Sequence, residues 1–176
     1  MSGHNKWSKI KHQKGASDAQ KSKLFSKMVR FITVESKKAG GNITSPGLKA
    51  AIEKAKASNV PNDTIDRAVK KGSTDNSAAM EAITYEAYGP GGCAIIIEAL
   101  TDNRNKASQE VKHIFAKRGF SLAGIGAASW AFKKENGEWI PQTTVKVSEE
   151  DGTVLQTIVG ELEDNDEVQD VYTNAE

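Results

Sequence analysis

The chain has 176 residues, with 24 Lys and Arg, 23 Asp and Glu and a formal net charge of +1, a length that fits one or two domains. The single cysteine, Cys93, excludes an intrachain disulfide and fits a reducing compartment. No apolar run approaches the length of a membrane span, and the first residues lack the apolar core of a secretion signal. We therefore expect a cytoplasmic protein without a membrane partner.

Charge is divided unevenly between the two halves of the chain. Residues 1–75 hold 16 Lys and Arg against 6 Asp and Glu, whereas residues 76–176 hold 8 against 17. Such asymmetry favours two domains with different partners. A basic domain attracts phosphate, and an acidic domain repels nucleic acid. The alternative is an unevenly charged, solvated surface without a ligand.

Residues 1–16 are interpreted as a mobile basic arm, because they show no clean hydrophobic period. Trp7, Ile10 and His12 lie among four lysines, at positions 6, 9, 11 and 14. Lysine is suited to phosphate, and a planar side chain such as Trp7 is suited to an unstacked base. In the alternative interpretation, Trp7 and Ile10 pack on the helices that follow. Both interpretations can hold together, with the lysines facing outward.

Residues 17–75 predict a basic bundle of three helices. Residues 17–38 begin at a capping Ser17 or Asp18, and the helical period places Leu24, Phe25, Met28, Phe31 and Ile32 on one face and a cationic ridge on the other. The ridge includes Lys23, Lys27 and Arg30.

A second helix is expected to start at Ser45 and Pro46, and a third to start at residues 61–63 and end at Gly72. Residues 73–79 have the small, polar composition of a linker. Three short amphipathic helices of this kind form a small bundle.

Residues 80–176 predict an acidic α+β domain. Strands are expected at 83–87, 93–100, 129–132, 143–147 and 167–173, with helices at 105–118 and 151–164 and a hairpin turn at 135–137. The fold class is therefore α plus (α+β), an N-terminal three-helix bundle followed by a mostly antiparallel sheet domain with two helices on one face.

The segment TDNRNK, residues 101–106, follows a predicted strand and opens a predicted helix. Asn103 and Asn105 are good turn and capping residues, which is the structural interpretation. Arg104 and Lys106 lie at the positive end of that helix within an acidic domain, and they could contact a phosphate. The sequence leaves both interpretations open.

No catalytic or metal-binding pattern is found in the sequence. The three histidines and Cys93 have no zinc-site spacing, and no nucleophile, base and orienting residue form a set. The GPGG segment at 89–92 precedes a strand rather than a helix, so it predicts a turn and not a phosphate loop. We expect a non-enzymatic protein without a cofactor or a metal.

Several segments resemble the YebC/PmpR family, which includes mitochondrial translational activators of cytochrome oxidase. The resemblance is carried by residues 3–30, 60–72, 85–92, 101–119, 140–147 and 162–176. Members usually carry a further α/β domain inserted after a strand like 129–132 and before a segment like 140–147. Here residues 133–139 alone bridge that interval. The resemblance therefore implies a short member without the third domain.

The family has been described as transcriptional regulators that bind promoter DNA, and also as ribosome-associated factors that relieve stalling. The resemblance thus implies a regulator of gene expression, most consistent with a translation factor that contacts large-subunit ribosomal RNA, with tRNA as a further candidate. The alternative is a transcriptional regulator that binds duplex DNA. A ridge made mostly of lysine holds phosphate and carries little sequence information, which weakens that alternative.

We expect a monomer, because the sequence has no evident dimer motif for a palindromic site. The candidate nucleic-acid contacts combine the arm, the ridge and the 103–106 segment. They are Lys6, Trp7, Lys9, Lys11, His12, Lys14, Lys23, Lys27, Arg30, Asn103, Arg104, Asn105 and Lys106.

Overall fold

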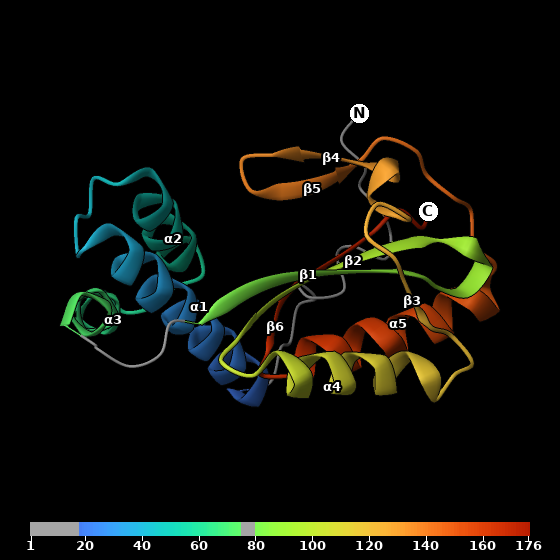
Figure 1. Ribbon diagram of the computed structural model, residues 1–176, viewed down its shortest axis with the longest axis horizontal. Helices are drawn as coiled ribbons and strands as arrows, with labels where there is room; N and C mark the ends of the chain where they lie inside the picture. The colour runs from blue at the N-terminus through green and yellow to red at the C-terminus, as the bar shows by residue number, and fades with distance from the viewer. Residues whose placement is uncertain (1–17, 75–79) are drawn as a thin grey trace. The chain divides into compact units, whose positions relative to one another are not determined.

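The computed structural model describes residues 18–74 and 80–176, which form two compact units that divide between Met80 and Glu81. We call residues 18–74 the helical unit and residues 81–176 the sheet unit, and each is described by itself (Figure 1). Of the helices in these described ranges, none is long and apolar enough to cross a membrane. The predicted order of a helical bundle followed by a sheet with helices is confirmed.

The helical unit contains the three predicted helices, α1 (Asp18–Ala39), α2 (Pro46–Ala57) and α3 (Asn62–Thr74). Met28 and Ile32 from the predicted apolar face of α1 are buried, whereas Leu24 from the same face is 37% exposed. The buried core of the unit consists of Met28, Ile32, Leu48, Ala51, Ala55, Val60, Ile65 and Ala68. Apolar burial from all three helices therefore holds the bundle together.

The ends of these helices follow the turn signals of the sequence. Gly40 and Gly41 end α1 with positive φ angles of 59° and 82°, a conformation that glycine adopts without steric cost. Pro46 occupies the first turn of α2 after Ser45, although the Ser45 side chain makes no capping hydrogen bond. The predicted start of α2 is therefore right, and its stabilisation comes from the proline rather than the serine hydroxyl.

The prediction that α3 ends at Gly72 is wrong, because the helix continues to Thr74. A Cβ atom at Gly72 would lie 2.4 Å from the Thr33 carbonyl oxygen and 2.6 Å from the Ser36 Cβ. Next to this contact, the Ser36 hydroxyl donates a hydrogen bond to the Val69 carbonyl at 2.6 Å. Gly72 therefore lets α1 and α3 approach closely, instead of ending a helix.

The sheet unit is built on a four-stranded antiparallel sheet. Its strands are β1 (Glu81–Tyr88), β2 (Ala94–Thr101), β3 (Leu122–Ala123) and β6 (Val168–Thr173), in the order β3-β1-β2-β6. The turn predicted at 89–92 is confirmed, and it leads directly into β2. Seven of the eight residues of β2 are buried, as expected for a central strand that is covered on both faces.

The two faces of this sheet have different covers (Figure 1). Helices α4 (Arg104–Ala116) and α5 (Glu149–Asp164) cover one face, as predicted, and pack Phe115 and Leu155 against Ile95 and Ile97. The other face is covered by a 3₁₀ turn, Ser129–Ala131, and by the hairpin of β4 (Phe132–Glu135) and β5 (Glu138–Pro141). The hairpin turn predicted at 135–137 is confirmed, with positive φ at Asn136 and Gly137.

Two predicted strands are wrong. Residues 129–131 form the 3₁₀ turn, and only Phe132 of the predicted 129–132 strand belongs to β4. Residues 143–147 make a single parallel bridge, between Val145 and Ala175, instead of a strand. The Val145 N–H donates to the Asn174 carbonyl at 2.9 Å, and the Glu176 N–H donates to the Val145 carbonyl at 2.7 Å. The end of the chain therefore pairs with this segment over too short a length to make a ladder.

Candidate nucleic-acid interface

The cationic ridge predicted in the helical unit lies on α1. Lys23 is exposed, and Lys27 and Arg30 are half-buried. Their spacing of four and three residues places them on one side of the helix. The helical unit holds 12 Lys and Arg against 5 Asp and Glu, so its carboxylates are too few to neutralise its cations. An excess of positive charge of this kind attracts phosphate and speeds encounter with nucleic acid.

Some cations of the helical unit have a carboxylate partner within their own helix. Lys38 lies 2.9 Å from Glu35, and the exposed Arg67 lies 3.6 Å from Asp63. Pairs of this kind between exposed side chains are weak, because water and salt screen them. They leave the positive balance of the unit in place.

The predicted arm lies outside the described residues. This applies to six of the candidate contacts, namely Lys6, Trp7, Lys9, Lys11, His12 and Lys14. The remaining candidates form two groups, one on α1 in the helical unit and one at the start of α4 in the sheet unit.

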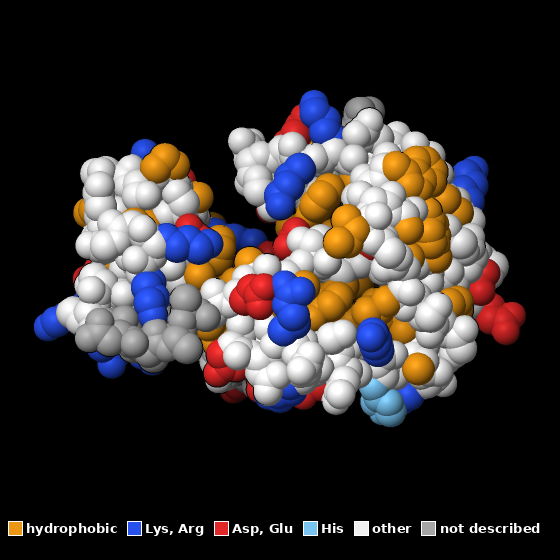
Figure 2. Space-filling model, in the orientation of Figure 1, with side chains coloured by type: hydrophobic (Ala, Val, Ile, Leu, Met, Phe, Trp, Pro, Cys, Tyr) orange, Lys and Arg blue, Asp and Glu red, His pale blue; other side chains and the backbone are white. Residues whose placement is uncertain are grey.

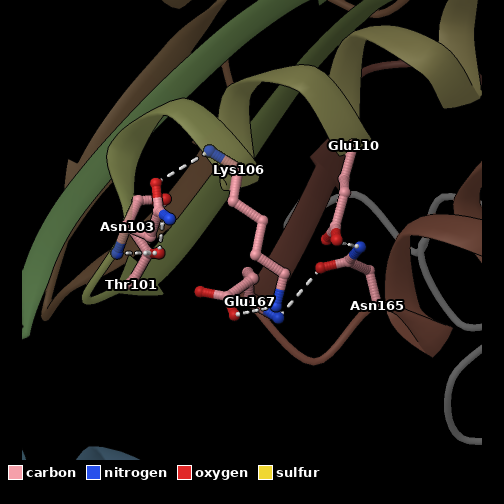
Figure 3. A network of polar contacts seen from close by, with 6 residues as sticks. All are labelled: Thr101, Asn103, Lys106, Glu110, Asn165 and Glu167. Atoms are coloured by element: carbon pink, nitrogen blue, oxygen red, sulfur yellow. Dashed lines mark hydrogen bonds and ion pairs between the residues drawn. The ribbon is translucent and has the colours of Figure 1, made fainter.

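Asn103 caps helix α4. Its side-chain oxygen accepts a hydrogen bond from the Lys106 N–H at 3.1 Å, and the Thr101 hydroxyl accepts one from the Asn103 N–H at 2.9 Å (Figure 3). A cap of this type satisfies a backbone donor that the first turn of a helix leaves without a partner. The geometry accounts for the structural interpretation of Asn103. Asn105, by contrast, is exposed at the first turn of α4.

Arg104 and Lys106 each face a carboxylate. The Arg104 guanidinium donates to both carboxylate oxygens of Glu81, through Nη2 and, at 3.2 Å, through Nε. These hydrogen bonds lower the pKa of Glu81. The Lys106 ammonium lies 3.4 Å from the buried carboxylate of Glu167. A phosphate at this helix start would have to compete with two carboxylates for the two cations.

A further set of hydrogen bonds ties the start of β6 to α4. The Asn165 amide donates to Glu110 at 2.7 Å, and the Glu167 N–H donates to the Asn165 side-chain oxygen at 2.9 Å (Figure 3). Glu167 is thereby held beneath Lys106. The 103–106 segment is thus a firmly positioned helix start with nearly balanced charge, whereas α1 belongs to a unit with a positive excess.

Sequence reasoning did not identify Glu81 and Glu167 as the partners of the 103–106 segment. Glu81 is 23 residues from Arg104, and Glu167 is 61 residues from Lys106. No local pattern marks either carboxylate, because strand pairing alone brings β1 and β6 beside the end of β2.

Comparison with known proteins gives two matching family models. The model of the TACO1/YebC protein N-terminal domain matches residues 5–75. The model of the TACO1/YebC second and third domain matches residues 80–137 and 134–175. The two segments of the second match meet within the β4–β5 hairpin.

Curated relatives carry the name probable transcriptional regulatory protein. One from Thermotoga petrophila is 49% identical over 152 residues, which are 85% of this chain and 60% of that protein. The chain therefore spans about three fifths of the length of that relative. One from Thermosipho africanus is 37% identical over 237 aligned residues, which cover all of this chain and 94% of the relative. Because the chain has 176 residues, the alignment includes internal residues of that relative without a counterpart here.

A solved structure has the same fold. The crystal structure of a conserved hypothetical protein from Aquifex aeolicus superposes with a TM-score of 0.82 and 31% sequence identity. The superposition covers 97% of this chain and 96% of that chain.

Proposed function

The chain belongs to the TACO1/YebC family, and from this premise we propose that it is a non-enzymatic, nucleic-acid-binding regulator of gene expression. We place it on the ribosome, as a translation factor that relieves stalling or activates translation. The observation that carries the proposal is the positive excess of the helical unit, 12 cations against 5 carboxylates, with Lys23, Lys27 and Arg30 on one side of α1.

The ridge on α1 and the lysines of residues 1–16 would hold the phosphates of large-subunit ribosomal RNA and of tRNA. Contacts to phosphate supply most of the affinity of such a protein and depend strongly on salt. Trp7 and His12 would add contacts to unstacked bases. The 103–106 segment would approach RNA only where a phosphate displaces Glu81 or Glu167 from its cation.

The sheet unit would orient the protein rather than hold RNA over a broad surface. Residues 76–176 hold 17 carboxylates against 8 cations, and such a surface repels phosphate. On a stalled ribosome the protein would favour a productive arrangement of the peptidyl-tRNA. This is catalysis by positioning, in which the ribosome supplies the chemistry.

A transcriptional regulator that binds duplex DNA is the second candidate, because curated relatives are named probable transcriptional regulatory proteins. Base readout in the major groove uses Arg, Asn and Gln on an exposed helix face. The ridge of α1 presents two lysines and one arginine, a set that is better suited to phosphate than to base edges. We therefore rank ribosomal RNA above duplex DNA.

We further propose that the chain is a short, monomeric member in which the third domain of longer relatives is missing near residues 133–139. In its place, Asn136 and Gly137 close the β4–β5 hairpin with positive φ angles of 50° and 81°. This two-residue turn matches the twist of the flanking strands. Activities of longer relatives that depend on the third domain would be absent here.

Co-sedimentation with ribosomes at low and moderate salt, beside binding to random duplex DNA, tests this proposal. We expect the protein to stay with the large subunit at moderate salt while its binding to DNA collapses. The variant Lys23→Ala/Lys27→Ala/Arg30→Ala should reduce the slope of log K against log salt by about two to three, since each lost phosphate contact removes about 0.7 to 0.9.

The matched control is Lys49→Ala/Lys56→Ala/Lys70→Ala, which removes the same charge from exposed positions of α2 and α3. Equal losses for the two triple variants would mean that charge alone acts and that α1 is not the contact. Retention of particular duplexes at moderate salt, together with release from the ribosome, would favour the transcriptional alternative.

A further inference from the structure

A second surface in the sheet unit has no role in the proposed phosphate contacts. Three large hydrophobic side chains of this unit are exposed, Ile125 by 100%, Trp130 by 61% and Tyr88 by 37%. Figure 2 shows hydrophobic side chains gathered in several places on the visible face of the unit. Tyr88 and Trp130 are hydrogen-bonded to each other, and exposed apolar side chains that lie together often mark an interaction site. Ile125 and Trp130 belong to one segment, residues 124–130, which we call the 124–130 loop and which ends within the 3₁₀ turn Ser129–Ala131. Tyr88 is hydrogen-bonded to it.

A buried carboxylate fixes the backbone of the 124–130 loop. Glu86 is 6% exposed, and it accepts hydrogen bonds from the N–H groups of Gly126, Ala128 and Ser129 at 2.6, 2.9 and 2.6 Å. Burial by itself raises the pKa of Glu86, but the three donors outweigh it and the pKa is lowered. The carboxylate is therefore charged at neutral pH and holds the loop strongly.

Further contacts of Tyr88 and Ala128 anchor this loop. The Tyr88 hydroxyl donates to the Ala127 carbonyl and accepts a hydrogen bond from the Trp130 indole at 2.8 Å. Ala128 is fully buried and packs with Ile96 against the sheet. The indole nitrogen is thus bonded to Tyr88, and the ring of Trp130 is held in place while the residue stays 61% exposed.

The loop is therefore ordered before any partner arrives, with its apolar side chains outermost. A side chain that is already held loses little conformational freedom on binding, so more of its contact energy appears as affinity. Tryptophan is enriched among the residues that dominate protein–protein interfaces. The N–H groups of Gly126, Ala128 and Ser129 bond to the buried Glu86, whereas the side chains of Ile125 and Trp130 are exposed.

The charge around the loop argues for a protein partner and against nucleic acid. Residues 119–132 contain no charged side chain. The flanking cations face carboxylates, with Arg118 at 2.5 Å from Glu161 and Lys133 at 2.5 Å from Glu135. Nucleic acid needs cations to hold its phosphates. The sheet unit instead has an excess of carboxylates, which complements a basic protein.

We infer that Ile125 and Trp130 dock into an apolar pocket on a basic protein of the ribosome, to which the negative net charge of the sheet unit attracts the chain. This inference rests on the proposed ribosomal function. It divides the contacts between the two units, with RNA held by the helical unit and protein held by the sheet unit.

Binding to intact ribosomes and to protein-free large-subunit ribosomal RNA, measured side by side, tests the inference. The variants are Ile125→Ser, Trp130→Ser and the double variant, with Ile43→Ser as a matched control, because Ile43 is 60% exposed in the helical unit. Ile125 is fully exposed, so its replacement leaves the fold intact. Thermal unfolding checks the same for Trp130→Ser.

We expect the double variant to bind intact ribosomes at least tenfold more weakly and to bind the protein-free RNA as the wild type does. Ile43→Ser should match the wild type in both assays. The ridge variant, Lys23→Ala/Lys27→Ala/Arg30→Ala, should lose affinity for both targets, which separates the two surfaces.

Three results would overturn the inference. An equal loss on protein-free RNA would show that Trp130 stacks on a base, and an unchanged affinity for ribosomes would show that the loop is not a contact. Self-association of the wild type in sedimentation equilibrium, abolished by Ile125→Ser, would make a second copy the occupant. If the wild-type protein does not bind ribosomes at all, the proposed function is wrong, and the docking inference falls with it. This result differs from a wild type that binds ribosomes and a double variant that binds them equally well, which would refute the docking inference alone.

Discussion

The two units differ in the sign of their net charge and in the roles of their charged side chains. In the helical unit, cations outnumber carboxylates by 12 to 5, so the unit carries an excess of positive charge. In the sheet unit, carboxylates are in excess, and several of them have a structural task. Glu81 and Glu161 pair with arginine, Glu167 pairs with lysine, and Glu86 binds backbone N–H groups.

This comparison shows that a cation identified from the sequence can already be paired with a carboxylate in the folded protein. Arg104 and Lys106 look like phosphate ligands by residue type, yet each faces a carboxylate. The lysines of α1 belong to a unit in which cations outnumber carboxylates. Affinity for phosphate is therefore expected from the helical unit. Substitutions in each unit test which contacts stabilise it and which residues have only a structural role.

The largest effect is expected where two helices touch. Gly72→Ala would place a methyl group 2.4 Å from the Thr33 carbonyl, and overpacking of this kind lowers stability by about 1–3 kcal/mol. The control is Gly160→Ala in α5, where an added Cβ meets nothing within 4 Å and where alanine should raise stability by about 0.5–1 kcal/mol. Chemical denaturation of both variants measures the contrast. Stabilisation by Gly72→Ala would refute the close crossing of α1 and α3.

The Glu86→Gln variant tests the contact that orders the 124–130 loop. Hydrogen bonds to a charged group contribute about 1.5–3 kcal/mol, and an amide group would bring its own N–H toward the three donors. We expect a loss of about 2 kcal/mol at neutral pH, measured by chemical denaturation. The exchange of the Gly126, Ala128 and Ser129 amides should also become faster.

The pH dependence of this loss follows from the lowered pKa of Glu86. The stabilisation is fully present above the unfolded-state pKa of about 4.3 and is lost as pH falls through the lower pKa of the folded state. The difference between wild type and Glu86→Gln should therefore be constant from pH 7 to about 5 and shrink below about 4. A difference that grows toward low pH would contradict a charged Glu86.

Replacement of Asn103 separates capping from ligand contact. Asn103→Ala removes the hydrogen bond to the Lys106 N–H and should cost about 1 kcal/mol of stability. Asn103→Ser keeps a capping oxygen and should restore most of that loss. If Asn103 acts only as a cap, both variants bind ribosomes as the wild type does. Weak binding by the well-folded Asn103→Ser protein would instead make Asn103 a contact residue.

The smallest effect is expected at the ion pairs that join the residues after α4 to α5. Arg118 and Lys117, at 2.5 and 2.7 Å from Glu161, lower its pKa to about 2. Because the group is partly exposed, Glu161→Gln should cost at most about 1 kcal/mol. The contribution of the pair is present above about pH 4.3 and fades as pH falls toward 2. Carboxyl NMR titration of Glu161 measures the pKa directly, and an ordinary value would exclude the pairing in solution.

Much of the fold could be predicted from the order of residue types along the chain. Periodic apolar residues located the α-helices found in residues 18–74 and 80–176, and the β-branched run of β2 located the central strand. Two of the errors, at residues 129–131 and at Gly72, share one cause, a contact with residues that are distant in the chain. Residues 129–131 have the composition of a strand, but the Ala128 and Ser129 N–H groups bond to a carboxylate more than 40 residues away in the chain. Gly72 has the position of a helix stop, but its role is set by Thr33 and Ser36.

The sequence by itself determined which segments are helical, where the two units divide in charge, and which family the chain resembles. These properties depend on neighbouring residues, because helical and strand periods are local and net charge is a sum over residue types. The tertiary structure alone decided that Arg104 and Lys106 face carboxylates and that Glu86 orders a loop with an exposed tryptophan. These outcomes depend on strands that are distant in the chain and adjacent in the sheet, so the partner of a charged group is settled only when the sheet forms.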